Sequence, residues 1–486
     1  MPRQREMTTQ RGMRGKLAAG AAGALSLVFL LSGCAPLPPG PAKGAAANRM
    51  IVWTSVTEMI GATDADLDKW RNMGIGGFMV DRGYLPGLGG AAEAQRPYQD
   101  WLRSADIVAR VHARGMKLYM GTKLTDYYTG TAAPGTVGPL GDWFDNANWS
   151  NTILPAFATW AAEAHALGFD GLNFDSEAYD RAVAWDGWNQ APGHTEQQVR
   201  AEVTTRGSQM MTALLSGFPA VDLMDYDTYL FPGAWNAWVQ HVVNHAPWPG
   251  YAESVDINWW DGMTRVLGYA NIRFTDATFY KGPNCSCGET FDSALSWNAN
   301  SFAAIMSQDF SNWAYAADRV SVTPMTWIDG NYPNEGTWSL PRGGAYVANQ
   351  LQEYRKWGED GVQVDFAFAG LKGFDYTPYV PALRASAQPG IVDTTPPTIK
   401  VTGLGSTLSG TAHDDFAVRV VRWAANGQSG AARLTYQVLT GSPAVGTYQM
   451  NWTANVPLNH GANRVTLLVE DIHGLIAATT VTVNVP

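Results

Sequence analysis

The feature that most constrains the fold is an alternation of strand and helix patterns, repeated eight times between residues 49 and 390. Short apolar runs alternate with longer amphipathic runs, and each pair has the length of one strand followed by one helix. Eight such units match a (β/α)8 TIM barrel, a closed parallel sheet covered by helices. The predicted strands are residues 51–57, 75–81, 117–125, 168–177, 221–229, 271–279, 320–328 and 361–368.

The amphipathic runs predict the covering helices. An Asp or Thr63 is expected to cap the first of them, because a carboxylate or hydroxyl oxygen can accept a hydrogen bond from a free backbone N–H. The predicted helices are residues 64–73, 101–114, 152–167, 196–215, 236–267 (with an insertion), 291–318 and 345–357.

The pattern changes at residue 391. Asp393-Thr-Thr-Pro-Pro397 predicts a linker, and short Val/Thr/Leu strands separated by Gly, Asn and Asp turns follow it. Residues 391–486 are therefore expected to form a small antiparallel β-sandwich. At residues 410–415 and 463–471 this segment resembles bacterial Ig-like modules of secreted glycan enzymes. The resemblance implies a spacer or support, with carbohydrate binding as the alternative.

The first residues predict export. A basic start precedes an apolar run at residues 17–31, which is too short for a membrane span and is typical of a signal peptide. The run ends in Leu-Ser-Gly-Cys34, which resembles the lipobox of bacterial lipoproteins. That resemblance implies a signal peptide at 1–33, a lipidated Cys34, a flexible tether at 34–48 and a chain anchored to the membrane at the bacterial cell surface.

Composition narrows the class of partner. The formal net charge of −10 becomes −14 once the five basic residues and one acidic residue of 1–33 are removed, which argues against nucleic acid. The 20 Trp and 19 Tyr favour carbohydrate, because sugar rings stack on flat aromatic faces. Cys285-Ser-Cys287 is a weak metal motif and an unfavourable disulfide spacing. We expect a monomer without cofactor or resident metal.

The fourth predicted strand carries the main candidate site. With a period of two, Asn173, Asp175 and Glu177 share one face of that strand, while Leu172 and Phe174 lie on the other. Two carboxylates so close raise the pKa of one of them, which keeps a carboxylic acid protonated near neutral pH. Glu177, nearer the rim, is the predicted general acid, and Asp175 is predicted to orient a reacting group.

Acidic and aromatic residues recur at the other predicted strand ends, where barrel enzymes gather their catalytic groups. The acidic ones are Asp81, Asp126, Asp175, Glu177, Asp227, Asp276, Asp329 and Asp365. The predicted substrate-binding residues are Asn173, Asp227, Trp53, Asp81, Asn258, Trp259, Trp260, Trp327 and Asp365.

A family resemblance follows from these motifs. Asp170-Gly-Leu-Asn-Phe-Asp-Ser-Glu177 resembles the Asp-x-x-Asp-x-Asp-x-Glu strand of family-18 chitinases and endoglycosidases, with Asn173 in place of the inner Asp. It is also similar to the strand of family-85 endo-β-N-acetylglucosaminidases, with Asp175 in place of an Asn. Tyr226-Asp227 and Asn258-Trp259-Trp260 resemble further family-85 segments, while residues 224–227 also match the family-18 Met-x-Tyr-Asp motif.

Both resemblances imply a glycoside hydrolase in which the 2-acetamido oxygen of the substrate attacks the anomeric carbon. Glu177 would act as acid and then base, Asp175 would polarise the acetamido group, and Tyr226 would hydrogen-bond it. Three alternatives remain open. They are two-carboxylate hydrolysis with Asp227, Asp329 or Asp365 as partner, a glycan-binding lipoprotein without catalysis, and a Mg²⁺ or Ca²⁺ site among the acidic strand ends.

Overall fold

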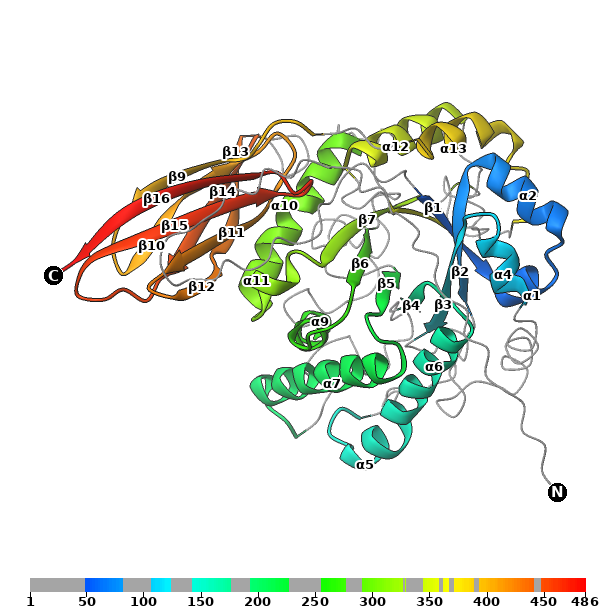
Figure 1. Ribbon diagram of the computed structural model, residues 1–486, viewed down its shortest axis with the longest axis horizontal. Coiled ribbons are helices and arrows are strands. Elements are labelled where there is room, and N and C mark those ends of the chain that lie inside the picture. The colour runs from blue at the N-terminus through cyan, green and yellow to red at the C-terminus, as the bar shows by residue number, and fades with distance from the viewer. Residues whose placement is uncertain are drawn as a thin grey trace, which may run out of the picture.

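The computed structural model describes two packed units of the chain (Figure 1). Within these residues no helix is long and apolar enough to cross a membrane. The predicted signal peptide, Cys34 and tether lie outside them. The described residues are 49–81, 106–123, 142–175, 193–226, 255–276, 291–326, 328, 344–357, 362–366, 371–388, 393–440 and 447–486.

The first unit is a closed barrel of eight parallel strands in chain order, with the first strand paired to the last. This confirms the predicted eightfold barrel. Strand β1 begins and ends two residues earlier than predicted, since a helix already begins at Val56. The strands are β1 (Arg49–Ser55), β2 (Ile75–Asp81), β3 (Lys117–Lys123), β4 (Gly171–Asp175), β5 (Asp222–Tyr226), β6 (Asn271–Asp276), β7 (Val320–Thr326) and β8 (Val362–Phe366).

Helices cover the outside of this barrel. They depart from the sequence analysis at three main places: α1 begins within the first predicted strand, the predicted helix 291–318 is divided into α10 and α11, and α13 was not predicted. The helical segments are α1 (Val56–Ile60), α2 (Asp64–Met73), α4 (Asp106–His112), α5 (Asn146–Asn148), η1 (Trp149–Ile153), α6 (Leu154–Ala166), α7 (Glu196–Gly217), α9 (Asp256–Arg265), α10 (Phe291–Asp309), α11 (Trp313–Ala316), α12 (Gly344–Trp357), η5 (Thr377–Tyr379) and α13 (Val380–Ser386).

Helix α2 shows why local sequence sets the element bounds. Thr63 accepts a hydrogen bond from the Asp66 backbone N–H, and the Asp66 carboxylate accepts one from the Thr63 N–H, so the predicted cap is a full capping box. The helix ends at Gly74, whose φ of 103° is left-handed. A Cβ at Gly74 would lie 2.6 Å from the Leu383 carbonyl oxygen, so α13 packs directly on this glycine.

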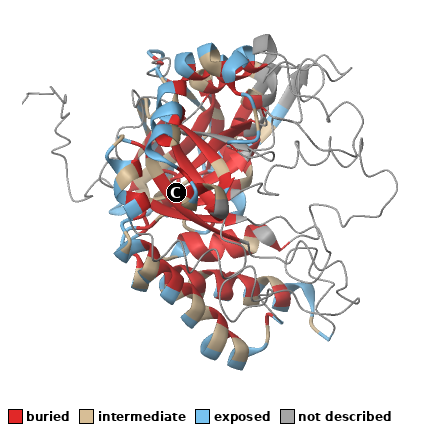
Figure 2. Ribbon diagram, turned by 90° about the vertical axis from the view of Figure 1, so that its right-hand side faces the viewer, coloured by how far each residue is buried: buried red, intermediate tan, exposed pale blue. Residues whose placement is uncertain are grey.

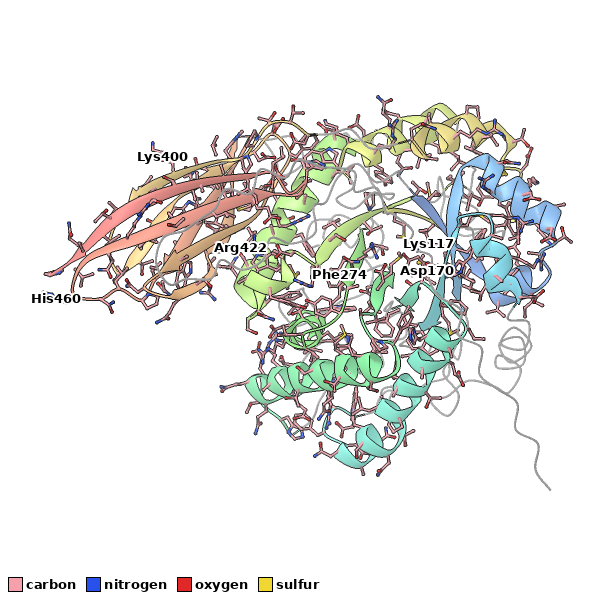
Figure 3. The ribbon with its side chains drawn as sticks, viewed as in Figure 1. Lys117, Asp170, Phe274, Lys400, Arg422 and His460 are labelled. Carbon is pink, nitrogen blue, oxygen red and sulfur yellow. The ribbon has the colours of Figure 1, made fainter. Side chains whose placement is uncertain are left out.

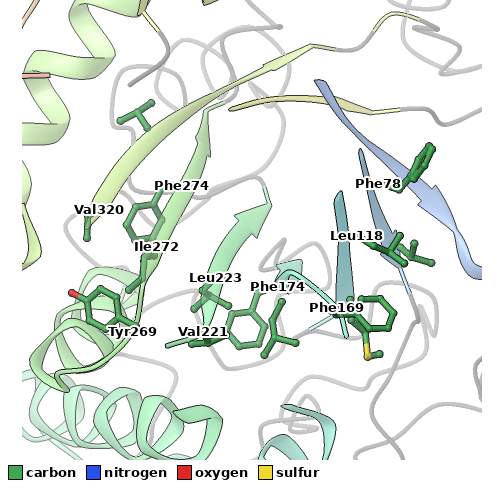
Figure 4. Close-up of a cluster of buried hydrophobic side chains, with 14 of the residues drawn as sticks. Phe78, Leu118, Phe169, Phe174, Val221, Leu223, Tyr269, Ile272, Phe274 and Val320 are labelled. Atoms are coloured by element: carbon green, nitrogen blue, oxygen red, sulfur yellow. The ribbon is translucent and has the colours of Figure 1, made fainter. Parts of the chain in front are cut away.

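The strands are largely buried (Figure 2), and apolar side chains on the outer face of the sheet form the core (Figure 4). Leu172 and Phe174 of β4 are fully buried there. The Phe174 ring lies 5.9 Å from Phe157 and 5.7 Å from Trp160, both on α6. Because alternate residues of a strand face opposite ways, this packing directs Asn173 into the barrel.

Two polar networks lie at the amino-terminal ends of the strands. Asp170 pairs with Lys117 and accepts hydrogen bonds at 2.9 Å from His112 and from the Leu118 N–H (Figure 3). This carboxylate therefore fixes the start of β4 to β3. The second network joins three strands of the barrel: Asp222 of β5 pairs with Arg273 of β6 and accepts a hydrogen bond from the Tyr119 hydroxyl of β3 at 3.2 Å.

Helices α7 and α9 cross at unusually close range. A Cβ at Gly207 would lie 2.1 Å from the Trp259 carbonyl oxygen, and one at Gly262 would lie 2.0 Å from the Thr204 carbonyl oxygen. The Ser208 hydroxyl donates a 2.8 Å hydrogen bond across the crossing to the Gly262 carbonyl. Only residues without a side chain allow the two backbones to approach this far.

The second unit consists of two four-stranded antiparallel sheets, in the orders β13-β14-β10-β9 and β12-β11-β15-β16. Side chains from both sheets, including Leu434 and Trp452 on one and Val421 and Leu467 on the other, form one buried cluster. The strands are β9 (Thr398–Gly403), β10 (Thr407–His413), β11 (Val418–Ala425), β12 (Gln428–Ala431), β13 (Arg433–Thr440), β14 (Thr447–Asn455), β15 (Gly461–Asp471) and β16 (Ile476–Val485).

Helix α10 of the barrel joins the two units. Its Ala303 and Ala304 belong to the buried cluster of the antiparallel sheets. The Leu434 N–H donates to the Ser307 hydroxyl at 2.8 Å, and the Gln308 amide donates to the Leu434 carbonyl at 3.0 Å. The antiparallel unit is thus packed on the barrel through shared apolar and backbone contacts.

Candidate active site

Four strands of the barrel end in a polar residue at the same rim. Asp81, Asp175, Tyr226 and Asp276 are the last residues of β2, β4, β5 and β6. In a closed parallel barrel these carboxyl ends lie together, and the active sites of such barrels are built there. The rim predicted from the sequence is therefore present at the level of the backbone.

The backbone register brings two of the predicted catalytic positions side by side. Asp175 of β4 pairs with Tyr226 of β5, and on its other side it pairs with Lys123 of β3. Adjacent strands lie about 4.8 Å apart, so the Asp175 and Tyr226 backbones are immediate neighbours at the rim.

Asn173 lies one step deeper in the barrel interior. It is 1% exposed, and its Oδ1 has no hydrogen-bond partner among the described residues. A buried amide oxygen without a partner is costly, roughly 1–3 kcal/mol, unless water or a ligand supplies a donor. Asn173 thus presents an unfilled acceptor directly below Asp175.

The strand register gives the positions of Trp53, Asp81 and Asp365. Trp53 of β1 alternates with the core residue Val52, so it faces the barrel interior, and it is partly exposed. Asp81 pairs with Ser55 and Gly121 at the rim. Asp365 lies one residue before the end of β8, where its backbone pairs with Val52 and Thr326.

The structure corrects the prediction for the 258–260 segment. Asn258, Trp259 and Trp260 belong to α9 in the outer helix layer, and both Trp side chains are 0% exposed. The Trp260 ring lies 4.8 Å from Phe274 on the outer face of β6, and the Asn258 amide oxygen accepts a 2.9 Å hydrogen bond from Arg200 of α7. These residues hold the helix layer together, and neither indole face is free to stack on a sugar.

Asp170, the first acidic residue of the motif, is also separated from the rim. Five residues along a strand from Asp175, at about 3.3 Å each, place it roughly 16 Å away at the opposite end of the barrel. Its bonds to Lys117, His112 and the Leu118 N–H describe a structural carboxylate.

Sequence reasoning missed Asp225. It lies between Met224 and Tyr226 on β5, is 0% exposed, and its carbonyl accepts a 2.8 Å hydrogen bond from the buried Thr275 hydroxyl. Its register partners are Phe174 and Phe274, both on the outer face of the sheet. The Met-Asp-Tyr-Asp motif contains Asp225. Only the alternation along β5 shows that Asp225 and Tyr226 belong to opposite faces of the sheet.

Several predicted residues lie outside the described part of the chain. The side chains of Asp81, Asp175, Tyr226, Asp276 and Asp365 are not described, although their backbones are. The residues outside are Glu177, Asp227, Trp327, Asp126, Asp329, Cys34, Cys285 and Cys287.

No family model and no curated protein sequence matches the chain. Among solved structures it is similar to a trimodular GH5_4 subfamily endoglucanase, with TM-score 0.41 and 11% identity, over 90% of this chain and 79% of the other. It is also similar to the tri-modular endo-beta-1,4-glucanase B of Bacillus halodurans (TM-score 0.40, 10% identity, 90% and 77%). A GH18 chitinase from Pseudoalteromonas aurantia matches with TM-score 0.37 and 9% identity over 69% and 99%. Likeness at this level carries no argument about activity.

Proposed function

We propose that the protein is a glycoside hydrolase that cleaves β-linked N-acetylglucosaminyl bonds by a substrate-assisted, retaining mechanism. The observation that carries the proposal is the pairing of Asp175 with Tyr226 at the carboxyl rim of the closed barrel, above the unfilled amide of Asn173. These positions are the ones that the resemblance to families 18 and 85 assigns to the acetamido group of the substrate.

The proposed chemistry uses three groups in order. Glu177, two residues beyond Asp175, protonates the glycosidic oxygen while the acetamido oxygen attacks the anomeric carbon and the bond to the leaving sugar breaks. Asp175 accepts a hydrogen bond from the acetamido N–H and stabilises the positive charge that develops on the cyclic intermediate. The Tyr226 hydroxyl donates to the acetamido oxygen and orients it. Glu177 then removes a proton from the water that opens the intermediate.

Asn173 and Trp53 complete the proposed site. The Asn173 amide oxygen would accept a hydrogen bond from a sugar hydroxyl or from an ordered water, which would satisfy the acceptor that the described chain leaves free. The partly exposed Trp53 offers an apolar surface for a pyranose ring.

We further propose that the chain is exported as a lipoprotein anchored through Cys34, acts at the bacterial cell surface as a monomer, and carries an Ig-like β-sandwich at 391–486. The lipobox resemblance supports the anchor, and the two antiparallel sheets support the sandwich. Their packing on α10 favours a support for the barrel over a freely tethered spacer.

Hydrolysis is tested directly. The purified protein is incubated with high-mannose glycopeptide, chitin oligosaccharides and peptidoglycan, and new reducing ends are measured. We expect release from at least one substrate, loss of on the order of 10²–10⁴-fold in Glu177→Gln, and full activity in the structural control Asp170→Asn below its melting temperature. Equal turnover by Glu177→Gln, or binding without turnover, contradicts the proposal.

Two-carboxylate hydrolysis is the second candidate, because Asp365 lies one residue before the end of β8, near the same rim. In that scheme Glu177 pairs with a distant carboxylate such as Asp227, Asp329 or Asp365. Glycans without an acetamido group distinguish the two. Their turnover favours two carboxylates, and strict dependence on the acetamido group favours substrate assistance.

A further inference from the structure

Four carboxylates from three separate segments meet in the second unit, at residues that the proposed hydrolase does not use. This acidic cluster takes Asp393 from the linker, Asp414 and Asp415 from the β10–β11 turn, and Asp471 from the end of β15. Ligand atoms of Asp393, Asp414 and Asp415 lie within 4.8 Å of one another, as do those of Asp393, Asp471 and His473. Oxygens that share one ion at about 2.4 Å can be at most about 4.8 Å apart.

Asp471, Asp414 and Asp393 each use one carboxylate oxygen to fix the local turn. Asp471 Oδ1 accepts hydrogen bonds from the His473 and Leu475 N–H groups at 2.8 and 2.9 Å. Asp414 Oδ1 accepts one from the Phe416 N–H at 2.9 Å, and Asp393 Oδ1 one from the Thr395 N–H at 2.8 Å. These bonds orient the side chains before any ligand arrives.

The second oxygens point to a ligand. Asp471 is 0% exposed, and its Oδ2 has no hydrogen-bond partner; the buried Oδ2 of Asp414 has none either. An ionised carboxylate deprived of water and of a partner is unfavourable by several kcal/mol.

Among the described residues, neither Lys nor Arg forms a salt bridge with any of the four carboxylates. The ionisable side chain paired with the cluster is His473, whose Nδ1 lies 3.4 Å from Asp393 Oδ2. The Nε2 of His473 donates to the Lys356 carbonyl at 3.0 Å, which ties that ring to the barrel.

We propose that the acidic cluster binds one calcium ion. Calcium takes six to eight oxygen ligands in flexible geometry, and carboxylates from several turns supply such a set together with backbone carbonyls and water. Asp393, Asp414 and Asp415, whose ligand atoms lie within 4.8 Å of one another, would bind the ion directly, and Asp471, which reaches Asp393 but not that whole group, would hold a water of the ion's shell. Softer ions fit less well because they prefer sulfur or nitrogen ligands to carboxylate oxygens. The smaller Mg²⁺ fits less well because it demands near-ideal octahedral geometry, whereas these carboxylates come from three separate segments.

The site lies at the junction of the two units, so the ion would stabilise their contact. Phe416, two residues after Asp414, packs edge-to-face on Trp357 of α12 at 5.2 Å and on His473 at 4.5 Å. The Ile472 N–H donates to the Ala417 carbonyl at 3.1 Å, joining the two turns. A cation held between these turns and the linker would lock the antiparallel sheets against the end of α12.

The test is calorimetry and melting of the full chain after treatment with EDTA. We expect one calcium per chain, a melting temperature that rises with calcium concentration, and reversal by EDTA. Asp471→Asn keeps an acceptor for the His473 and Leu475 N–H groups, so it should fold, yet bind calcium on the order of tenfold or more weakly. Asp375→Asn is the matched control, because Asp375 caps the Thr377 N–H at 3.0 Å away from the cluster and should change nothing.

Three outcomes overturn the proposal. Calcium without effect on the wild type excludes the site. A larger shift with Zn²⁺ than with Ca²⁺ assigns the cluster to a nitrogen-containing site built on His473. An Asp414→Asn variant that melts higher than the wild type, with no response to calcium in either, shows that the carboxylates share protons instead of an ion. Circular dichroism at 20 °C confirms that each variant is folded.

Discussion

The crossing of α7 and α9 gives the sharpest stability prediction, the substitution Gly207→Ala. In an isolated helix Ala is favoured over Gly by about 1 kcal/mol. Here the new Cβ would lie 2.1 Å from the Trp259 carbonyl oxygen, more than 1 Å inside normal contact, so the helices must separate. Overpacking of this kind costs about 1–3 kcal/mol.

Separation also lengthens the 2.8 Å hydrogen bond from Ser208 to the Gly262 carbonyl, worth about 1 kcal/mol. The three contributions leave Gly207→Ala destabilised by about 1–3 kcal/mol. Urea unfolding followed by Trp fluorescence reports it, because Trp259 is fully buried beside the crossing. Thr205→Ala, at an exposed position of the same helix, is the control and should be neutral or slightly stabilising. A Gly207→Ala protein as stable as the wild type would refute the close crossing.

Three further predictions concern buried and capping charges. Arg206→Met should destabilise by about 3 kcal/mol in urea unfolding, because the buried guanidinium donates to the Trp143 carbonyl at 2.8 Å and to the Asn146 amide at 2.6 Å; a loss below about 0.5 kcal/mol would contradict this. Asp170→Asn should lower the melting temperature without changing kcat. A loss of kcat measured well below that melting temperature would place Asp170 in the chemistry. The Thr63 bonds hold the pKa of Asp66 at about 2, below its ordinary 3.8, so the stability they give is present above pH 4 and lost as the pH falls towards 2. Asp66→Ala removes the carboxylate that accepts from the Thr63 N–H, so it should cost about 1 kcal/mol at pH 7 and flatten that acid loss in melting curves, and an unchanged acid dependence would exclude the capping box.

The barrel could be predicted because short strand patterns alternate regularly with longer amphipathic runs along the chain, even where polar residues interrupt strands such as β4 and β5. The bounds of β2 and α2 agree with the structure, since Thr63 and Gly74 mark the ends of α2 in the sequence itself. Residues 56–57 were assigned to β1 because Val and Thr favour strands, but Val56 is buried as the start of α1.

The misplaced residues share one physical cause. Asn258-Trp259-Trp260 reads equally well as an aromatic rim or as a packed helix, because only tertiary packing decides which face of an indole is covered. Gly207 and Gly262 add nothing to a hydrophobic pattern, so the sequence could not predict the close approach of α7 and α9 at these residues. Asp471 looks like an ordinary turn residue, and only the folded chain brings it to Asp393 and Asp414.

The central claim is that Glu177 protonates a glycosidic bond whose own acetamido group is the nucleophile. The most direct measurement compares hydrolysis of matched β-linked glycosides with and without the 2-acetamido group, by the wild type and by Glu177→Gln. The account predicts turnover only of the acetamido substrate, and loss of that turnover in the variant. Hydrolysis of both substrates at similar rates, or an active Glu177→Gln protein, would contradict it.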